Sequence, residues 1–263
     1  GPGSKHALLD SLKLTILGSA TSQGVPVIGC DCPACRSTDP RDDRTRNSAL
    51  FSRGDSHVVI DTGPDFRRQM LRTGIKEVAG VLYTHEHNDH VAGMDDLRPF
   101  CFRQKMDIPL YALPRVVKEI KSRFAYAFGE NRYPGVPTLK FHEIEAGDHV
   151  PLGDFIFEAI PVMHGRLPIL GFRCEDVAYL TDVKTLDPVA KGRLRNLRVL
   201  VITCLQREPH IAHLTLDECL ALIEELQPER AILTHLSHLI GPHAQLQAVL
   251  PRGVEVGYDG MIL

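Results

Sequence analysis

Three histidines and one aspartate stand within six consecutive positions of the chain, in the run THEHNDH. They are His85, His87, Asp89 and His90. Imidazole and carboxylate groups are suited to zinc, manganese and iron. In an extended run the first two histidines point to the same side while Glu86 points away, and the last two residues lie at the turn into a helix predicted from Val91 onwards. This pattern predicts a metal site.

Three further residues with metal-binding side chains stand where apolar, strand-like runs stop, namely His164, Asp182 and His235. Apolar residues anchor each strand in the core, so the first residue beyond its end is held rigidly and can serve as a ligand. The ends of parallel strands also meet at one shared site. We therefore expect two ions, Zn²⁺ or Mn²⁺ with iron also compatible, roughly 3.5 to 4 Å apart with a hydroxide between them. A lone carboxylate such as Asp182 can bridge such a pair.

The segments that must position these side chains alternate between strand-like and helix-like patterns. The predicted strands cover residues 12–17, 57–61, 80–84, 155–162, 177–181, 199–203 and 230–234. The predicted helices cover residues 66–74, 114–129 and 214–228. Gly74 is expected to end the first helix in a left-handed conformation, and Thr215 lies where the third should begin. Such alternation is typical of an α/β protein.

Length and composition favour one domain. The chain has 263 residues with 43% hydrophobic content, which is enough to bury a substantial core. Residues 1–4 have the composition of a remnant from a cleaved expression tag, so the single domain is predicted to cover residues 5–263. No apolar run approaches the roughly 18 residues that a membrane span needs, and nothing near the start resembles a secretory signal. We therefore expect a cytoplasmic location and no membrane partner.

Charge narrows the choice of partners. The net charge of -3 and the pI near 6.5 supply no basic field of the kind that draws long nucleic acids to a surface. We therefore expect no strong binding of long nucleic acids and a small substrate, even if that substrate resembles a nucleotide. A homodimer is compatible with the sequence.

Three of the seven cysteines crowd together as Cys30, Cys32 and Cys35. They stand too close in the sequence for mutual pairing to make a sensible disulfide framework. Reduced thiols and a bound metal fit this spacing better. The other four cysteines are predicted to be buried small apolar residues.

The metal-binding residues resemble those of the metallo-β-lactamase superfamily. The resemblance implies a four-layer αββα sandwich of two mixed β-sheets flanked by helices. It assigns one ion to His85, His87, His164 and bridging Asp182. It assigns the other ion to Asp89, His90, Asp182 and His235. Asp61 in IDTGP matches the first acidic motif of that superfamily, which supports the site from behind the ligands.

The cysteine cluster makes the resemblance more specific. The runs GCDCPACR and THLSHL are similar to the branch that contains the phosphoribosyl cyclic phosphodiesterase of the carbon–phosphorus lyase pathway, and the closing GYDGMIL is similar too. That branch holds a structural zinc, which implies one structural Zn²⁺ at the loop 29–36. Its ligands would be Cys30, Cys32, Cys35 and His238. Three thiolates and one imidazole close a tetrahedron without an open position, so the implied role is in folding.

A general acid for the leaving oxygen is predicted in the loop between residues 203 and 214. The same branch places an active-site histidine there, and His213 is the better match. The similarity through LQREPHIAHLT is loose, so His210 stays a competitor. Asp89 and Asp182 are the carboxylates predicted to take part in catalysis as ligands.

Several cations and donors are available for phosphate recognition. Arg98 in DDLRPF is the first choice, because its counterpart in the branch has a similar position. Arg46 with Asn47 and Ser48, and Arg166 after His164, are the other candidates.

These observations predict a metal-dependent phosphodiesterase that cleaves a small cyclic or nucleotide-like ester with a hydroxide activated by two ions. Three alternatives share the metal ligands. A transfer-RNA 3′-processing endonuclease carries an RNA-docking arm, and this chain has no Lys/Gly-rich insertion to form one. A lactonase or thioesterase would use the same hydroxide on a carbonyl group. A non-catalytic accessory protein resembling the one in pyrroloquinoline quinone biosynthesis predicts a degenerate site, whereas all seven ligands stand in this sequence.

Overall fold

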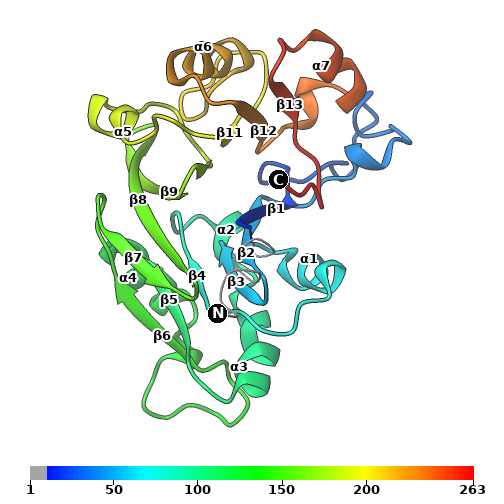
Figure 1. Ribbon diagram of the computed structural model, residues 1–263. Helices are drawn as coiled ribbons and strands as arrows, with labels where there is room; N and C mark the ends of the chain where they lie inside the picture. The colour runs from blue at the N-terminus through cyan, green and yellow to red at the C-terminus, as the bar shows by residue number, and fades with distance from the viewer. Residues whose placement is uncertain (1–10) are drawn as a thin grey trace, which may run out of the picture.

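The computed structural model describes residues 11–263, so the predicted tag remnant at 1–4 lies outside the described residues. Two mixed β-sheets pack face to face and helices flank them (Figure 1). This arrangement confirms the predicted sandwich. No helix within residues 11–263 is both long and apolar enough to cross a membrane.

The first sheet is built from the N-terminal half of the described chain. Its strands follow one another in sequence order: β1 (Lys13–Gly18), β2 (Ser48–Arg53), β3 (Ser56–Ile60), β4 (Gly80–Leu82), β5 (Ile108–Ala112) and β6 (Leu139–Glu143). The first three strands are antiparallel, and β3 to β6 are parallel. The carboxyl ends of β3 and β4 therefore meet at one edge of the sheet.

The second sheet is built from the C-terminal half. From one side to the other its strands are β13 (Val254–Val256), β12 (Arg230–Thr234), β11 (Val199–Thr203), β10 (Val177–Leu180), β9 (Leu167–Cys174), β8 (Phe155–His164) and β7 (His149–Leu152). Strands β7 to β10 form an antiparallel meander, and β10 to β13 are parallel. The parallel part aligns the ends of β10, β11 and β12.

Helices connect the parallel strands. They are α1 (Phe66–Thr73), α2 (Asn88–Val91), α3 (Arg98–Gln104), α4 (Pro114–Arg123), α5 (Pro188–Gly192), α6 (Leu216–Leu226) and α7 (His243–Val249). Short 3-10 turns are η1 (Pro40–Asp42), η2 (Met94–Leu97), η3 (Ala125–Ala127) and η4 (His238–Ile240). Gly74 ends α1 with a φ of 70°, and Thr215 begins α6 in a reciprocal capping box with Glu218. Both predicted helix boundaries are confirmed.

Three apolar layers hold the sandwich together. One layer lies between the sheets, where Phe51 of β2 meets Phe157 of β8 edge to face with ring centroids 5.2 Å apart. A second layer packs α1, α3 and α4 against the first sheet. A third layer packs α5, α6 and α7 against the second sheet. With both faces of each sheet covered by apolar contacts, the strand ends are fixed relative to one another.

Candidate dinuclear metal centre

The strand ends of both sheets deliver ligand-type side chains to one place. The loop after β4 and the short helix α2 supply four of them, the last residue of β8 supplies one, the second residue after β10 supplies one, and the residue directly after β12 supplies one. The structure brings together all seven residues that the sequence predicted: His85, His87, Asp89, His90, His164, Asp182 and His235. His87 is exposed and Asp89 is half-buried, so the cluster is open to solvent on that side.

Three of the strand-end residues adopt a left-handed backbone. Asp61 after β3, Asp182 after β10 and His235 after β12 have φ values of 63°, 52° and 57°. A residue other than glycine pays roughly 1 to 3 kcal/mol for such a conformation, and it persists only where the surroundings enforce it. At Asp182 and His235 this backbone turn follows the strand and places the side chain of the residue itself in the cluster, while Asp61 lies behind it against His90.

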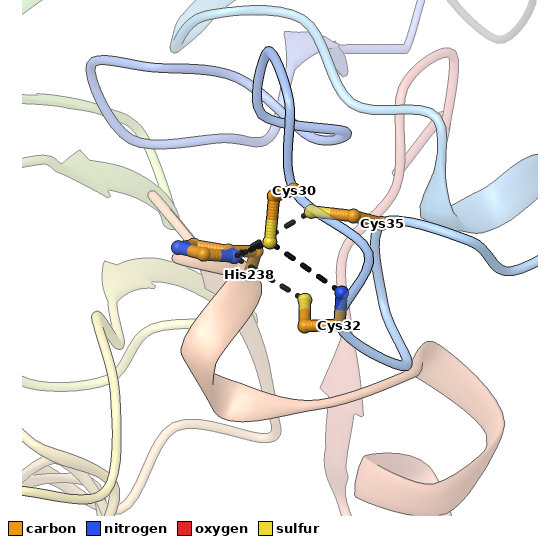
Figure 2. A group of neighbouring side chains, drawn as sticks. All are labelled: Cys30, Cys32, Cys35 and His238. Atoms are coloured by element: carbon orange, nitrogen blue, oxygen red, sulfur yellow. Dashed lines mark hydrogen bonds between the residues drawn. The ribbon is translucent and has the colours of Figure 1, made fainter.

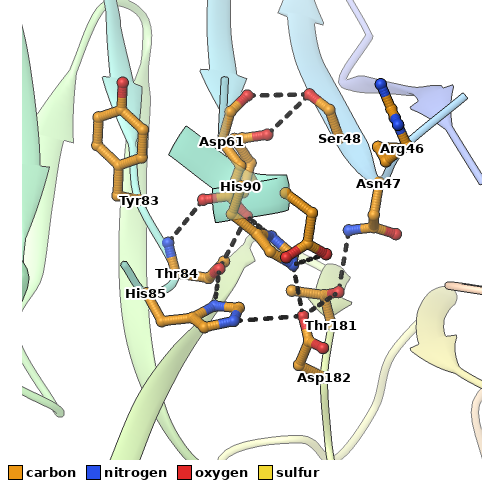
Figure 3. Close-up of polar contacts among 12 residues, drawn as sticks. Arg46, Asn47, Ser48, Asp61, Tyr83, Thr84, His85, His90, Thr181 and Asp182 are labelled. Atoms are coloured by element: carbon orange, nitrogen blue, oxygen red, sulfur yellow. Dashed lines mark hydrogen bonds and ion pairs between the residues drawn. The ribbon is translucent and has the colours of Figure 1, made fainter. Parts of the chain in front are cut away.

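The carboxylate of Asp182 faces four ligand imidazoles, and Figure 3 shows it beside His85. Its Oδ2 is 2.7 Å from Nε2 of His90 and 3.6 Å from Nε2 of His85. Its Oδ1 is 3.1 Å from Nε2 of His235 and 3.9 Å from Nε2 of His164. One carboxylate therefore faces imidazoles from both sheets, which is the arrangement a bridging ligand needs.

The donor atoms form overlapping groups in which every atom lies within 4.8 Å of the others. One group is His85, His87 and His164. A second is His85, His90 and Asp182, and a third is Asp89, His90 and His235. Because these groups share members, they form one continuous cluster of possible metal ligands.

The buried ring nitrogens at the centre show that the cluster fits metal ions. Within the described part of the chain, Nε2 of His85 has no hydrogen-bond partner, and Nε2 of His90 and of His235 lies 2.7 and 3.1 Å from carboxylate oxygens of Asp182 in contacts without hydrogen-bond geometry. A buried polar nitrogen without a partner is costly, and ligation by an ion satisfies it. Burial lowers the pKa of His85 well below its usual value, which keeps the ring neutral as a ligand must be.

Behind the ligands, a second set of contacts fixes the ring orientations. Oδ2 of Asp61 lies 2.7 Å from Nδ1 of His90. The same carboxylate accepts hydrogen bonds from the backbone N–H and the hydroxyl of Thr84, both at 2.8 Å. Oγ1 of Thr84 also lies 2.8 Å from Nδ1 of His85. Held by Nδ1, these two rings present Nε2 to the cluster.

His213 lies among the ligand side chains, while His210 stands three residues earlier in the same loop. Nδ1 of His213 is buried and 3.5 Å from Oδ1 of Asp182, and its ring centroid is 4.6 Å from that of His164. Nδ1 of His210 instead accepts a hydrogen bond from the N–H of Ala212 at 3.0 Å. Burial beside other histidines lowers the pKa of His213 to about 3, so its ring is neutral at pH 7.

The candidate substrate-binding residues have different surroundings. Nε of Arg98 pairs with Asp95 at 3.0 Å on a half-exposed surface, and Nε of Arg46 pairs with Asp65 at 2.6 Å. A substrate role for Arg98 stays a prediction. Asn47 is fully buried and donates to protein hydroxyls, so its amide does not face a substrate.

One contact near the ligands had no signal in the sequence. Nε of Arg115 in α4 donates to Glu86 at 2.8 Å, and its Nη2 donates to the carbonyl of Pro168 in β9 at 2.7 Å. Glu86 stands between two ligand histidines, and β9 follows the strand that ends in His164. The guanidinium therefore connects ligand-bearing segments of the two sheets. These contacts are visible only in the folded structure, because no sequence motif surrounds Arg115.

A second group of donors lies in the loop before η1, next to η4. Figure 2 shows its members: Cys30, Cys32, Cys35 and His238. The three Sγ atoms lie 3.4, 3.3 and 3.5 Å from Nδ1 of His238. A tetrahedral zinc with ordinary bond lengths places sulfur and nitrogen corners about 3.5 Å apart. The donor set and its spacing therefore fit a closed zinc site.

Comparison with protein families agrees with this fold and site. A family model described as a beta-lactamase superfamily domain matches residues 56–236. Because this match covers more than half of the chain, the chain belongs to the metallo-β-lactamase superfamily. It has the metallo-β-lactamase fold, which implies divalent metal ions.

The particular branch follows from a solved structure. The chain superposes on a diphosphatase from the PhnP family with a TM-score of 0.90 and 38% identity, over 96% of each chain. The predicted resemblance to that branch is confirmed. Zn²⁺-bound PqqB from Methylobacterium extorquens shares the fold, with a TM-score of 0.77 and 20% identity over 95% of this chain and 99% of that chain.

A curated relative is longer than this chain. The octanoyltransferase of Porphyromonas gingivalis (strain ATCC BAA-308 / W83) is 39% identical over 252 residues, which are 95% of this chain and 51% of that protein. The chain thus spans about half the length of that relative.

Proposed function

We propose that this protein is a hydrolase, a dinuclear phosphodiesterase that cleaves a small cyclic or nucleotide-like phosphodiester. The observation that carries the proposal is the set of overlapping donor groups around the carboxylate of Asp182. Imidazole and carboxylate donors suit Zn²⁺ and Mn²⁺, and iron is compatible. A solved relative named as a diphosphatase adds diphosphate esters to the substrates that we would test.

We divide the ligands between two ions as the family resemblance implies. One ion would be held by His85, His87, His164 and Asp182. The other would be held by Asp89, His90, Asp182 and His235. When bound, such a pair of ions supplies an activated water and neutralises the charge that develops on the phosphoryl oxygens.

The protein's own side chains orient these ligands and handle the proton. Asp61 holds His90 by Nδ1, so that Nε2 faces the pocket. Hydrolysis adds the oxygen of a water to phosphorus, breaks the bond from phosphorus to the leaving oxygen and transfers a proton to that oxygen. We assign this transfer to His213, whose Nδ1 lies in the pocket. A neutral imidazole can stabilise a developing oxyanion by donating its N–H to it. The proton that the attacking water loses then replaces the one that the ring gives to the leaving oxygen.

We also propose that the cysteine cluster holds a structural Zn²⁺. The supporting observations are the sulfur-to-nitrogen distances around His238 and the backbone N–H groups of Val27 and Cys32, which donate to the sulfurs of Cys35 and Cys30. Hydrogen bonds to the ligand atoms are typical of metal sites.

The decisive experiment pairs metal analysis with a panel of substrates. Protein purified without chelator and loaded with Mn²⁺ or Zn²⁺ would be assayed on bis-p-nitrophenyl phosphate, a cyclic nucleotide phosphodiester and a dinucleoside diphosphate. We expect cleavage, with kcat/KM reduced roughly a thousand-fold or more in Asp182→Asn. Asp176→Asn removes a half-exposed carboxylate at a surface ion pair and should behave like the wild type. Failure of protein with two bound ions to cleave any phosphodiester would refute the proposal.

The relative from Porphyromonas gingivalis favours acyl thioester hydrolysis as a second candidate function. That protein is named an octanoyltransferase, and this chain matches about half of it. We infer that a hydrolase joined to an acyl-transferring half could act on an acyl thioester, because the same activated water can attack a carbonyl carbon. Octanoyl-coenzyme A in the panel distinguishes the two functions: hydrolysis of this thioester without cleavage of phosphodiesters would favour the second.

A further inference from the structure

Asn47 is a fully buried amide at the junction of the two sheets. It stands directly before β2 in the first sheet, and all its side-chain partners belong to the second sheet. Its Nδ2 donates to the hydroxyl of Tyr179 at 2.5 Å and to Oγ1 of Thr181 at 2.9 Å. Its Oδ1 accepts from Oγ1 of Thr234 at 3.3 Å. One side chain therefore joins three positions on two parallel segments of the opposite sheet.

Two of these partners are the residues directly before metal-binding side chains. Thr181 precedes Asp182, and Thr234 precedes His235. Both ligands have a left-handed backbone, which their surroundings must enforce. Thr181 also donates from Oγ1 to Oδ2 of Asp182 at 3.3 Å, and Figure 3 shows this chain of contacts from Asn47 to the central carboxylate.

We infer that Asn47 is a positioning residue for the metal centre, which fixes Asp182 and His235 relative to each other and to the first sheet. An apolar side chain of the same size would fill the same space between the sheets. Only an amide offers donors and an acceptor to three hydroxyls at once. The inference rests on the proposed dinuclear site, and it concerns the binding of metal instead of the identity of the substrate.

The test compares variants that break this network at different points. Asn47→Leu removes all three hydrogen bonds at similar volume. Thr181→Val and Thr234→Val each remove the hydroxyl next to one ligand, and Thr181→Ser keeps the hydroxyl at the first position. Tyr179→Phe also removes a hydrogen bond to Asn47, but its hydroxyl is not adjacent to a ligand.

Metal binding is measured on the full chain by competition with a chromophoric chelator for Mn²⁺ and Zn²⁺, together with metal stoichiometry and urea unfolding. We expect Asn47→Leu, Thr181→Val and Thr234→Val to weaken binding at the dinuclear site about 10- to 100-fold. Thr181→Ser should restore the affinity that Thr181→Val loses. Tyr179→Phe should lower the unfolding midpoint while metal affinity stays within about two-fold of the wild type.

Gln104→Ala serves as the matched control, because Gln104 makes two side-chain hydrogen bonds to the backbone of Val78 away from the ligands. If metal affinity in the network variants falls no further than in Gln104→Ala or Tyr179→Phe, the inference is wrong. Should Asn47→Leu fail to fold, the two threonine variants decide the question. Because the readout is metal affinity, a chain that cleaves no phosphodiester would refute the proposed function and leave this result standing.

Discussion

Each metal-facing imidazole with an identified anchor in this site is held by Nδ1, the ring nitrogen that points away from the pocket. His90 is held by Asp61, His85 by Thr84, and Nδ1 of His164 by the carbonyl of Ala212 at 2.9 Å. A hydrogen bond at Nδ1 selects the tautomer whose Nε2 lone pair can bind an ion.

Asp61→Asn tests whether the contact at Nδ1 supports metal binding, because Asp61 makes the shortest of these contacts. The amide has about the same shape, but it places an NH₂ group against either His90 or the donors of Thr84, and it removes the negative charge that favours ligation. We expect metal affinity at the dinuclear site to fall about 10- to 100-fold with little change in fold. Chelator competition measures the affinity, and circular dichroism monitors the fold. Unchanged affinity would show that the carboxylate does not support the ligand.

His243 provides a pH-dependent prediction away from the metal sites. It is buried, and Nδ1 lies 3.1 Å from Nη2 of the buried Arg44. Burial and the positive charge of Arg44 lower the pKa of His243 to about 4, against about 6.5 in the unfolded chain. The unfolded chain therefore binds the proton first, so the stability that the neutral ring provides is present above pH 6.5 and is lost as the pH falls towards 4.

The matched variant is His243→Gln, which keeps an acceptor for Arg44 but does not titrate. Between pH 7.5 and pH 4.5 we expect the wild type to lose about 2 kcal/mol more than the variant in its free energy of unfolding. Urea unfolding at the two pH values measures the difference, and metal loss at low pH affects both proteins alike. Equal losses in the two proteins would contradict the prediction.

At the scale of elements, the cysteine cluster joins two segments that are far apart in sequence. The loop before η1 supplies three donors and η4 supplies the fourth. Beside them the backbone N–H of Thr21 donates to the carbonyl of Leu236 at 3.0 Å, and that of Leu236 to Ser19 at 2.9 Å. His235 and His238 stand three residues apart, so the two sites share one short segment.

Cys32→Ser should therefore release one zinc per chain and lower the melting temperature, because a structural site contributes its binding free energy to folding. Asp182→Ala should abolish activity while the chain stays folded and keeps the zinc of the cysteine site, with a smaller loss of melting temperature. Metal analysis and thermal unfolding of both variants measure the contrast. Equal destabilisation by the two substitutions would contradict the division of roles.

Seven strands with apolar runs were predictable, whereas β2, β5, β6, β7, β9 and β13 had no predicted counterpart. The runs that became β1, β3, β4, β8, β10, β11 and β12 were predicted close to their observed bounds. β9 contains Pro168 and Gly171, and a side-chain carbon at Gly171 would lie 2.3 Å from Leu180. β5 contains Pro109. These residues interrupt the apolar pattern of the strand in the sequence. They occur there because of contacts with neighbouring strands of the sheet. The helix predicted for 114–129 ends at Arg123.

At the scale of the whole molecule, the sequence predicted which side chains meet, but it did not predict what holds them. Ligand types at strand ends made the convergence of His164, Asp182 and His235 predictable. Asn47 and Arg115 carry no such signal. Asn47 was predicted as a phosphate donor, and its actual partners come from strands more than 130 positions away. Contacts between two sheets depend on how the sheets pack, which no local pattern encodes.

The apolar layer between the sheets carries a stability prediction. Phe157 is fully buried there against Phe51, whereas its neighbour Ile156 points outwards and is 62% exposed. We expect Phe157→Ala to lower the free energy of unfolding by about 3 to 5 kcal/mol, and Ile156→Ala to change it by less than about 1 kcal/mol. Urea unfolding measures both. A small effect at Phe157 would mean that the sheets repack around the cavity.

The division of the ligands between the two sheets has a consequence for the protein in a cell. His85, His87, Asp89 and His90 follow strands of one sheet, and His164, Asp182 and His235 follow strands of the other. Any ion held by both sets cross-links the two sheets, and its binding free energy adds to the stability of the folded state. In a cell short of that ion, the protein would then lose its activity and would also be degraded faster. The amount of protein in the cell would therefore follow the supply of the metal.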